Sequence, residues 1–184
     1  DTILVESPTY FGFLQLIASL GMKTLEVPTH PRHGLCLDAA ERALRQERVA
    51  ACLLMPNFHN PLGSLMPDEH KRDLVALLDR YDVPLVEDDL YGELYFEGAR
   101  PKPVKAFDTE GRVLYCSSFS KTVSPGFRLG YVAPGRYRKA VLATKVARSY
   151  ATSAPVQLAM AEYLQHGGYD RHLRRHLRTL ASNN

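Results

Sequence analysis

The chain has 184 residues, of which 45% are hydrophobic and 23% are charged, and its formal net charge is +3 at pH 7. This is the composition of an ordinary globular chain with one main core, and its basic residues are mostly interspersed with acidic ones, so charge alone identifies no partner. The longest apolar run, 49–55, is too short to cross a bilayer, and no signal-peptide pattern is present, so we expect a soluble protein without membrane contact.

Short apolar runs alternate with longer amphipathic stretches along the chain. In chain order, the pattern predicts a strand at 2–5, a helix at 10–20, a strand at 23–27, a helix at 37–46, strands at 49–55 and 83–86 with a helix at 67–81 between them, and strands at 112–116 and 129–132. From 136 the pattern is helical, with breaks at 153–155 and 167–168. We find no internal repeat.

Cysteine and histidine residues give no metal site. Cys36, Cys52 and Cys116 are far apart and form no CxxC pair, which favours a reducing, cytoplasmic setting. His172 and His176 have the helical spacing of a metal pair, but arginines surround them, so a solvated basic helix face is the favoured interpretation. No metal is predicted.

Strands that are apolar on both faces and alternate with helices indicate an α/β fold of three layers, with a mainly parallel sheet covered on both sides. Ligands then bind at the carboxyl ends of the strands. Three polar stretches follow predicted strands and are expected to meet at that end of the sheet: 56–63, 87–91 and 117–128.

The third stretch contains a lysine between small hydroxyl residues. Lys121 could attack an aldehyde as a free amine and form a Schiff base, if a partly desolvated site and a cationic neighbour lowered its pKa. Arg128 has the planar donor geometry that suits a phosphate, and Ser118 and Ser120 add neutral donors. The implied ligand carries an aldehyde and a phosphate.

The other two stretches add groups for a heteroaromatic ring. Asp88, which follows a buried strand, could keep a pyridine nitrogen protonated, and Asn60 and Tyr91 could hydrogen-bond a phenolic oxygen on the same ring. Together these groups describe pyridoxal 5'-phosphate (PLP). Each motif alone has a plainer interpretation as a solvated loop, a turn or a capped strand end, and only their joint occurrence points to the cofactor.

The order and spacing of PNFHNPLG, VEDDLYGELYF and SSFSKTVSPGFRLGY resemble the large domain of the fold-type I PLP-dependent aminotransferases. The resemblance implies that Asn60 and Tyr91 bind the ring oxygen and that Asp88 binds the pyridine nitrogen.

The same resemblance implies that Lys121 is the Schiff-base lysine. Ser118 and Arg128 match the phosphate ligands of the family, and Tyr10 lies where the family places an aromatic side chain that stacks on the cofactor ring. On this basis, residues 1–150 are part of the PLP-binding large domain, and 151–184 are a helical segment leading toward a small domain that is absent from the chain.

Within the superfamily, the sequence is most similar to the aminotransferase-like domain of MocR regulators, a group of GntR-type transcriptional regulators. The stretches that carry this similarity are EDDLY, YCSSFSK and GYDRHLRR. The resemblance implies a homodimer that senses an amino acid or amine and binds DNA only through a winged-helix domain outside this chain.

Two alternatives stay open. Certain free-standing aminotransferases share much of the first two of these stretches. Transaminase chemistry, the exchange of an amino group between an amino acid and a 2-oxo acid, is therefore possible for the full-length protein. We also expect the chain to be a fragment, without the family's upstream phosphate-binding helix start, so a site too incomplete to retain PLP is a third possibility.

Overall fold

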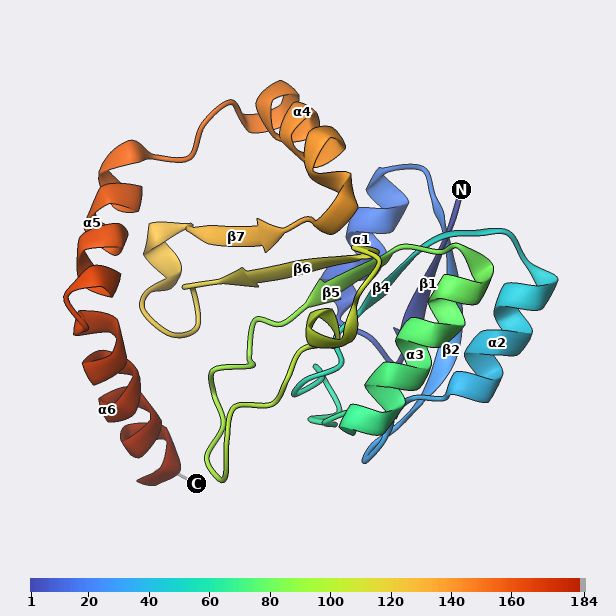
Figure 1. Cartoon of the computed structure of the whole chain (residues 1–184), viewed down its shortest axis with the longest axis horizontal. Coiled ribbons are helices and arrows are strands. Elements are labelled where there is room, and N and C mark those ends of the chain that lie inside the picture. The colour runs from blue at the N-terminus through green and yellow to red at the C-terminus, as the bar shows by residue number, and fades with distance from the viewer. Residues whose placement is uncertain (183–184) are drawn as a thin grey trace.

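The computed structural model describes residues 1–182, which form a seven-stranded sheet flanked by helices (Figure 1). The strands are β1 (Thr2–Ser7), β2 (Lys23–His30), β3 (Gly34–Leu35), β4 (Val49–Leu54), β5 (Leu85–Asp88), β6 (Val113–Ser118) and β7 (Gly130–Ala133). The α-helices are α1 (Phe11–Ser19), α2 (Leu37–Gln46), α3 (Asp68–Tyr81), α4 (Arg138–Ser149), α5 (Ala154–Gln165) and α6 (Gly168–Ser182). Short 3-10 helices are η1 (Val104–Phe107), η2 (Pro125–Phe127) and η3 (Gly135–Tyr137).

The sheet has the strand order β3-β2-β1-β4-β5-β6-β7. β2, β1, β4, β5 and β6 are parallel, whereas β3 and β7 at the two edges run antiparallel to their neighbours. The predicted three-layer α/β fold with a mainly parallel sheet is thus confirmed. Because β1 has β2 on one side and β4 on the other, the chain reverses its direction of travel across the sheet at β1. Such a switch point opens a crevice at the carboxyl ends of the strands.

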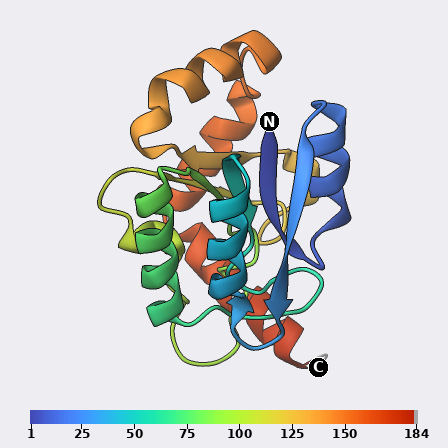
Figure 2. The same cartoon turned by 90° about the vertical axis from the view of Figure 1, so that its right-hand side faces the viewer.

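The main core lies between the sheet and helices α2 and α3. These two helices lie side by side on one face of the sheet, and α1 lies on the other (Figures 1 and 2). Leu4, Leu54 and Leu85 from three neighbouring strands are fully buried there, together with Leu74 and Leu78 of α3. Completely burying such side chains stabilises the fold by about 2 kcal/mol each.

Helix α3 shows how local sequence sets the boundaries of an element. Pro67 precedes its first turn, and Asp82 ends it in the left-handed conformation, with φ of 52°. Arg112, the residue before β6, then holds this helix end, because its Nε and Nη1 atoms lie 2.6 Å from carboxylate oxygens of Asp79 and Asp82, respectively.

The C-terminal quarter forms an arc of helices on the β7 side of the sheet (Figure 1). Helices α4, α5 and α6 lie within the segment predicted to be helical from 136, and the gaps between them, 150–153 and 166–167, overlap the two predicted breaks. They are largely exposed: Met160 is the only buried side chain of α5, and α4 has none among the described residues. None of the helices described here has the length and apolar character to traverse a bilayer.

Candidate PLP site

The three polar stretches do meet at one end of the sheet. Leu54 of β4 pairs with Glu87 of β5, and Asp88 pairs with Cys116 of β6, all in parallel register. The segments that leave these three strands therefore start next to one another. This topology places the turn bearing Asn60, the end of β5 and the β6–β7 connection bearing Lys121 at the same end of the sheet.

The two adjacent aspartates at the end of β5 differ sharply in their surroundings. Asp89 is 1% exposed. Its carboxylate accepts hydrogen bonds from Asn57 Nδ2 (3.0 Å), Tyr115 Oη (2.8 Å) and Arg100 Nη2 (3.1 Å). With these protein donors in place, Asp89 has little capacity to bind a ligand. The sequence alone did not distinguish Asp88 from Asp89 in this way.

Asp88 keeps its acceptor capacity. It is half-buried, and within residues 1–182 its carboxylate accepts one hydrogen bond, from Leu90 N at 3.2 Å. Burial raises the pKa of Asp88 to about 6, and the nearby negative charge of Asp89 adds to the rise. A carboxylate that is costly to ionise and has a free oxygen is suited to a cationic N–H donor. This is the property needed to hold a protonated pyridine nitrogen.

Asn60 lies on a turn that is fixed from beneath by buried groups. The backbone N of Asn60 donates to Met55 Sδ (3.2 Å), and Leu62 N donates to His59 Nδ1 (3.3 Å). The other ring nitrogen of His59 lies 3.4 Å from Glu6 Oε2, and the same carboxylate oxygen accepts from Met55 N (2.7 Å). The Asn60 side chain is thus presented from a rigid support rather than a free loop.

Replacement of His59 by alanine should therefore destabilise the fold. The variant loses an acceptor for Leu62 N and leaves the buried Glu6 carboxylate facing a cavity, so we expect the free energy of unfolding in urea to fall by about 3 kcal/mol. His166 is the control, because its side chain is 68% exposed; its replacement by alanine should change the free energy by less than about 0.5 kcal/mol. Equal effects of the two substitutions would show that the His59 pair does not support this turn.

Lys121 and Tyr91 come together across the site. Lys121 Nζ lies 5.6 Å from the centroid of the Tyr91 ring, which is within the range of a cation–π contact. The lysine is exposed. Among the salt bridges of the described residues, none includes Lys121 or Arg128. Both cationic groups are therefore available to a ligand.

The proposed phosphate ligands lie on the β6–β7 connection. Ser118 ends β6, and its Oγ accepts a hydrogen bond from Ser120 N (3.2 Å). Arg128 adopts the left-handed conformation, with φ of 48°, and its guanidinium makes one weak contact, from Nη1 to Pro125 O at 3.5 Å. Ser124 accepts from Gly126 N and stabilises the turn between them. The connection presents a cation and hydroxyl groups to solvent, as an anion site requires.

Tyr10 occupies the start of α1, just beyond the carboxyl end of β1. Its ring packs against Gly12, where a Cβ atom would overlap it, and makes an edge contact with Phe13. The structure shows no contact between Tyr10 and the other candidate residues, so its stacking role stays a prediction.

These observations fit PLP. A free carboxylate oxygen on Asp88 corresponds to the pyridine nitrogen of that molecule. The Lys121 amine and the Arg128 guanidinium, which have no ionic partner in the described part of the chain, correspond to its aldehyde and phosphate. Asn60 and Tyr91 jointly line a cavity of about 470 Å³, whose other walls are mainly apolar: Phe58, His59, Pro61, Gly63, Leu94, Phe96 and Leu180. An apolar surface thus adjoins the expected ring-oxygen ligands.

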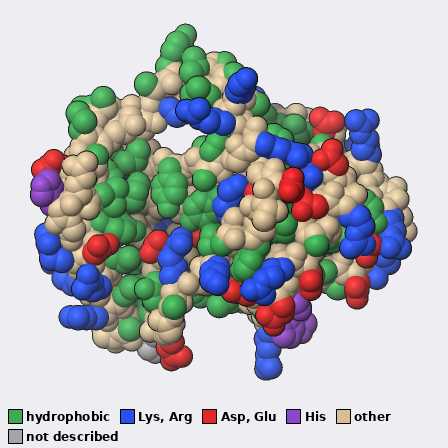
Figure 3. Space-filling view, viewed as in Figure 1, with side chains coloured by type: hydrophobic (Ala, Val, Ile, Leu, Met, Phe, Trp, Pro, Cys, Tyr) green, Lys and Arg blue, Asp and Glu red, His purple; other side chains and the backbone are tan. Residues whose placement is uncertain are grey.

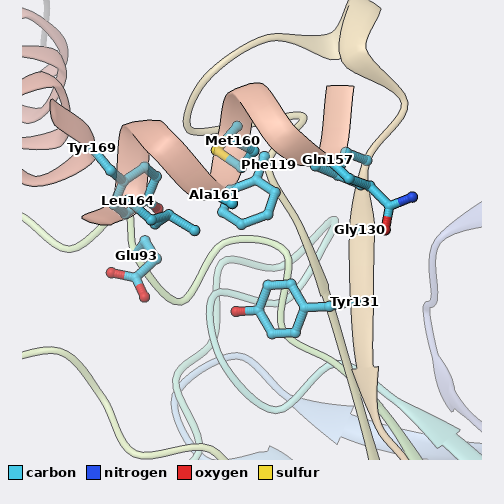
Figure 4. Close-up of a pocket in the computed structure, with 10 residues that line it drawn as sticks. Glu93, Phe119, Gly130, Tyr131, Gln157, Met160, Ala161, Leu164 and Tyr169 are labelled. Carbon is cyan, nitrogen blue, oxygen red and sulfur yellow. The ribbon is translucent and has the colours of Figure 1, made fainter. Parts of the chain in front are cut away.

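A second cavity, of about 530 Å³, lies between the β6–β7 connection and helices α5 and α6. Figure 4 shows Phe119, Met160 and Leu164 around it, and Figure 3 shows apolar side chains gathered in the hollow on this side of the molecule. None of the predicted PLP ligands lines this cavity. It is therefore distinct from the candidate site.

Sequence analysis missed the buried polar residues beneath the site. Glu6, Asn57 and His59 are at most 2% exposed, although all three are polar. The available signal is the run 57–60, in which three of four residues are polar and which is separated from the end of β4 by two residues. Arg100 and Tyr115 had no signal, because their partner Asp89 lies far from them in the sequence.

The family model described as aminotransferase class I and II matches residues 1–183. The chain belongs to this family. The predicted family resemblance is thereby confirmed. The cofactor that the family and similar structures bound to PMP or to a phosphopyridoxyl ligand indicate is PLP.

Family members that resemble the chain include both regulators and enzymes. The chain is 46% identical over 181 residues to YdcR and 45% identical over 175 residues to YjiR, both named as uncharacterized HTH-type transcriptional regulators of Escherichia coli (strain K12). These matches cover 98% and 95% of the chain but 39% and 37% of the two regulators.

Among solved structures, the chain is similar to LysN, an alpha-aminoadipate aminotransferase from Thermus thermophilus. The TM-score is 0.90 and the sequence identity 32%, over 97% of this chain and 46% of LysN. That structure was solved in complex with N-(5'-phosphopyridoxyl)-L-leucine. The chain therefore spans less than half the length of each of these three proteins.

Proposed function

We propose that the chain is the PLP-binding, aminotransferase-like domain of a GntR/MocR-type transcriptional regulator that senses an amino acid or amine. The observation that carries the binding function is a group of ionic side chains at one end of the sheet that have no ionic partner within residues 1–182: Asp88, Lys121 and Arg128. The regulatory role is supported by the identity of 45% and 46% to two HTH-type regulators over nearly the whole chain.

The residues divide the recognition of PLP among them. Arg128, Ser118 and Ser120 would bind the phosphate, and Asp88 would keep the pyridine nitrogen protonated. When bound, PLP supplies an aldehyde that condenses with amines and a ring that accepts electrons. Lys121 is the amine that this site offers to the aldehyde.

Three side chains would orient the ring itself. Asn60 and Tyr91 would donate to the ring oxygen from neighbouring segments, and Tyr10 would cover one ring face. Contacts from several segments fix a planar ligand in rotation as well as position, which a single phosphate anchor does not. The amine ligand would enter beside the apolar cavity that adjoins Asn60 and Tyr91.

In this proposal the protein is a cytoplasmic homodimer, and DNA is bound by a winged-helix domain outside this chain. A ligand can shift a regulator only if it binds one arrangement of domains more tightly than another. Attachment of an amine at the Lys121 end of the site would provide that difference, and reciprocity then requires operator DNA to change the affinity for the amine.

A catalytic role in a free-standing aminotransferase is the second candidate. Its specific support is the TM-score of 0.90 to LysN, because the elements that carry the candidate residues have the same arrangement in that enzyme. The two proposals share every residue of the PLP site. They differ in whether ligand binding at the site alters DNA binding or leads to amine exchange.

The full-length protein should therefore shift operator DNA in a manner that depends on both PLP and one amino acid or amine, with little steady turnover. Electrophoretic mobility shift with a panel of amino acids, and an amine-exchange assay with 2-oxo acids on the same preparation, measure the two properties. Steady exchange by a protein without a winged helix would replace the regulator proposal with the aminotransferase.

A further inference from the structure

Beneath the candidate site, four polar side chains form a network centred on the buried carboxylate of Asp89. Asn57 Nδ2, Tyr115 Oη and Arg100 Nη2 all donate to its carboxylate, and Arg100 Nη2 also donates to Tyr115 Oη at 3.0 Å. Arg100 makes a second ion pair with Glu93, at 2.8 Å. Asp89 and Asn57 are 1% and 0% exposed, whereas the Arg100 side chain is 33% exposed, so the network is closed to water around Asp89 and reaches solvent at Arg100.

The backbone of Asp89 is fixed as firmly as its side chain. Asp89 N donates to Cys116 O (2.9 Å), and Ser117 Oγ donates to Asp89 O (3.0 Å). Gly92 packs directly against the carboxylate, since a Cβ atom at that position would collide with both oxygens. These contacts restrain the placement of Asp89, and its neighbour Asp88 is restrained through the peptide that joins them.

The network joins the segments that carry the PLP ligands. Asn57 lies three residues before Asn60 on the turn after β4, Asp89 follows Asp88 at the end of β5, and Tyr115 lies on β6, which leads to Ser118. No other described residue accepts side-chain hydrogen bonds from both β6 and the turn after β4. A displacement of Asp89 would thus change the positions of several ligands at once.

Stability alone is a poor explanation for this arrangement. Desolvation of two charges offsets most of their attraction, and well-packed apolar side chains of similar volume are often as stable as a buried ion pair. What the hydrogen bonds to Asp89 add is a preferred geometry for its carboxylate, because each donor has a preferred direction. Asn57 is held only through its Nδ2, since its Oδ1 has no hydrogen-bond partner among the described residues.

We propose that Asp89 is a positioning residue, which sets the relative placement of Asp88 and Asn60 through Asn57, Arg100 and Tyr115 without touching the ligand. The inference rests on the proposed PLP site. It separates the two adjacent aspartates by role: Asp88 meets the cofactor, and Asp89 holds the support on which Asp88 and Asn60 lie.

The test compares Asp89→Asn with a matched control, Asp108→Asn, in the full-length protein. Asp108 is also a buried carboxylate: its side chain is 0% exposed and accepts from Lys105 Nζ (2.7 Å), Arg112 N (2.9 Å) and Val113 N (3.0 Å). Because Val113 begins β6, this control lies at the opposite end of the sheet from the site. Three measurements are made on each variant: the melting temperature, the dissociation constant for PLP, and the pH midpoint of the visible absorbance of bound PLP.

Both variants should lose thermal stability, since each loses charge-assisted hydrogen bonds. Asp89→Asn alone should raise the dissociation constant for PLP, by about tenfold, and shift the pH midpoint, because Asp88 no longer meets the ring nitrogen in the same geometry. A second variant, Gly92→Ala, displaces the Asp89 carboxylate without removing its charge and should shift the midpoint in the same direction. If the Asp89→Asn protein does not fold, the Gly92→Ala variant provides the same test.

The other results are equally decisive. If Asp89→Asn and Gly92→Ala keep the wild-type dissociation constant and midpoint while the wild type binds PLP, Asp89 has no positioning role and the proposed function stands. If the wild-type protein does not bind PLP at all, the proposed function is wrong, and the positioning role falls with it.

Discussion

Replacement of Lys121 by alanine is expected to abolish the covalent attachment of PLP and the visible absorbance that goes with it. Lys121 has no ionic partner among the described residues, and its Nζ lies over the Tyr91 ring at the end of the sheet where the other candidate ligands meet. Absorbance spectra of the PLP-loaded protein before and after addition of borohydride measure the effect.

Lys139 and Lys145 provide controls for this experiment. Both lie on α4, an exposed helix beyond β7, so their replacement by alanine should leave the spectrum unchanged. Retention of the absorbance in the Lys121 variant, with its loss in either control, would assign the covalent role to another lysine.

Asp88→Asn is expected to lower any amine-exchange rate by at least roughly a hundredfold, with a smaller loss of PLP affinity. The substitution keeps the shape of the side chain and removes the charge that holds the ring nitrogen protonated. Single-turnover spectroscopy with a saturating amine separates the rate from the affinity. A variant with an unchanged rate would contradict the assignment of Asp88 as the ring-nitrogen partner.

The same substitution lowers the exchange rate but should raise the stability of the fold at neutral pH. Burial holds the pKa of Asp88 at about 6 in the folded chain, above its ordinary value. Between that ordinary value and about 6, the folded state therefore keeps a proton that the unfolded state has released, so wild-type stability falls as the pH rises through this window. Asparagine has no proton to lose.

Relative to the wild type, the Asp88→Asn protein without PLP should thus gain stability with rising pH, by up to about 3 kcal/mol above pH 6. Below the ordinary pKa of an aspartate, the two proteins should be nearly equal. Urea unfolding at several pH values tests the sign. A side chain that lowers stability at neutral pH but is needed for ligand binding is the expected signature of a functional carboxylate.

The arrangement of the sheet could be predicted because its strands are short, apolar and separated by helices. Helix α2 matches its predicted bounds, and α3 begins one residue later than predicted, after Pro67. The two-residue strand β3 was not predicted, because it is too short to show any periodicity and exists only through its pairing with β2. The antiparallel direction of β7 likewise depends on a pairing that local pattern does not encode.

The residues of the candidate site likewise fall into a group that the sequence predicts and a group that it does not. Residues at or just beyond strand ends, such as Asp88 and Asn60, could be predicted because parallel strands bring their carboxyl ends together. The residues that hold them could not. Asp89 and Tyr115 are 26 residues apart, and Glu6 and His59 are brought together from β1 and the turn after β4. Such contacts depend on tertiary packing.

The central claim is that Lys121 is the amine at which this site binds the aldehyde of PLP. It is tested most directly by loading the full-length protein with PLP, reducing it with borohydride, digesting it and locating the modified lysine by mass spectrometry. We predict one modified lysine per chain, Lys121. Stoichiometric modification of Lys71, Lys102 or another lysine, with an unmodified Lys121, would contradict the account.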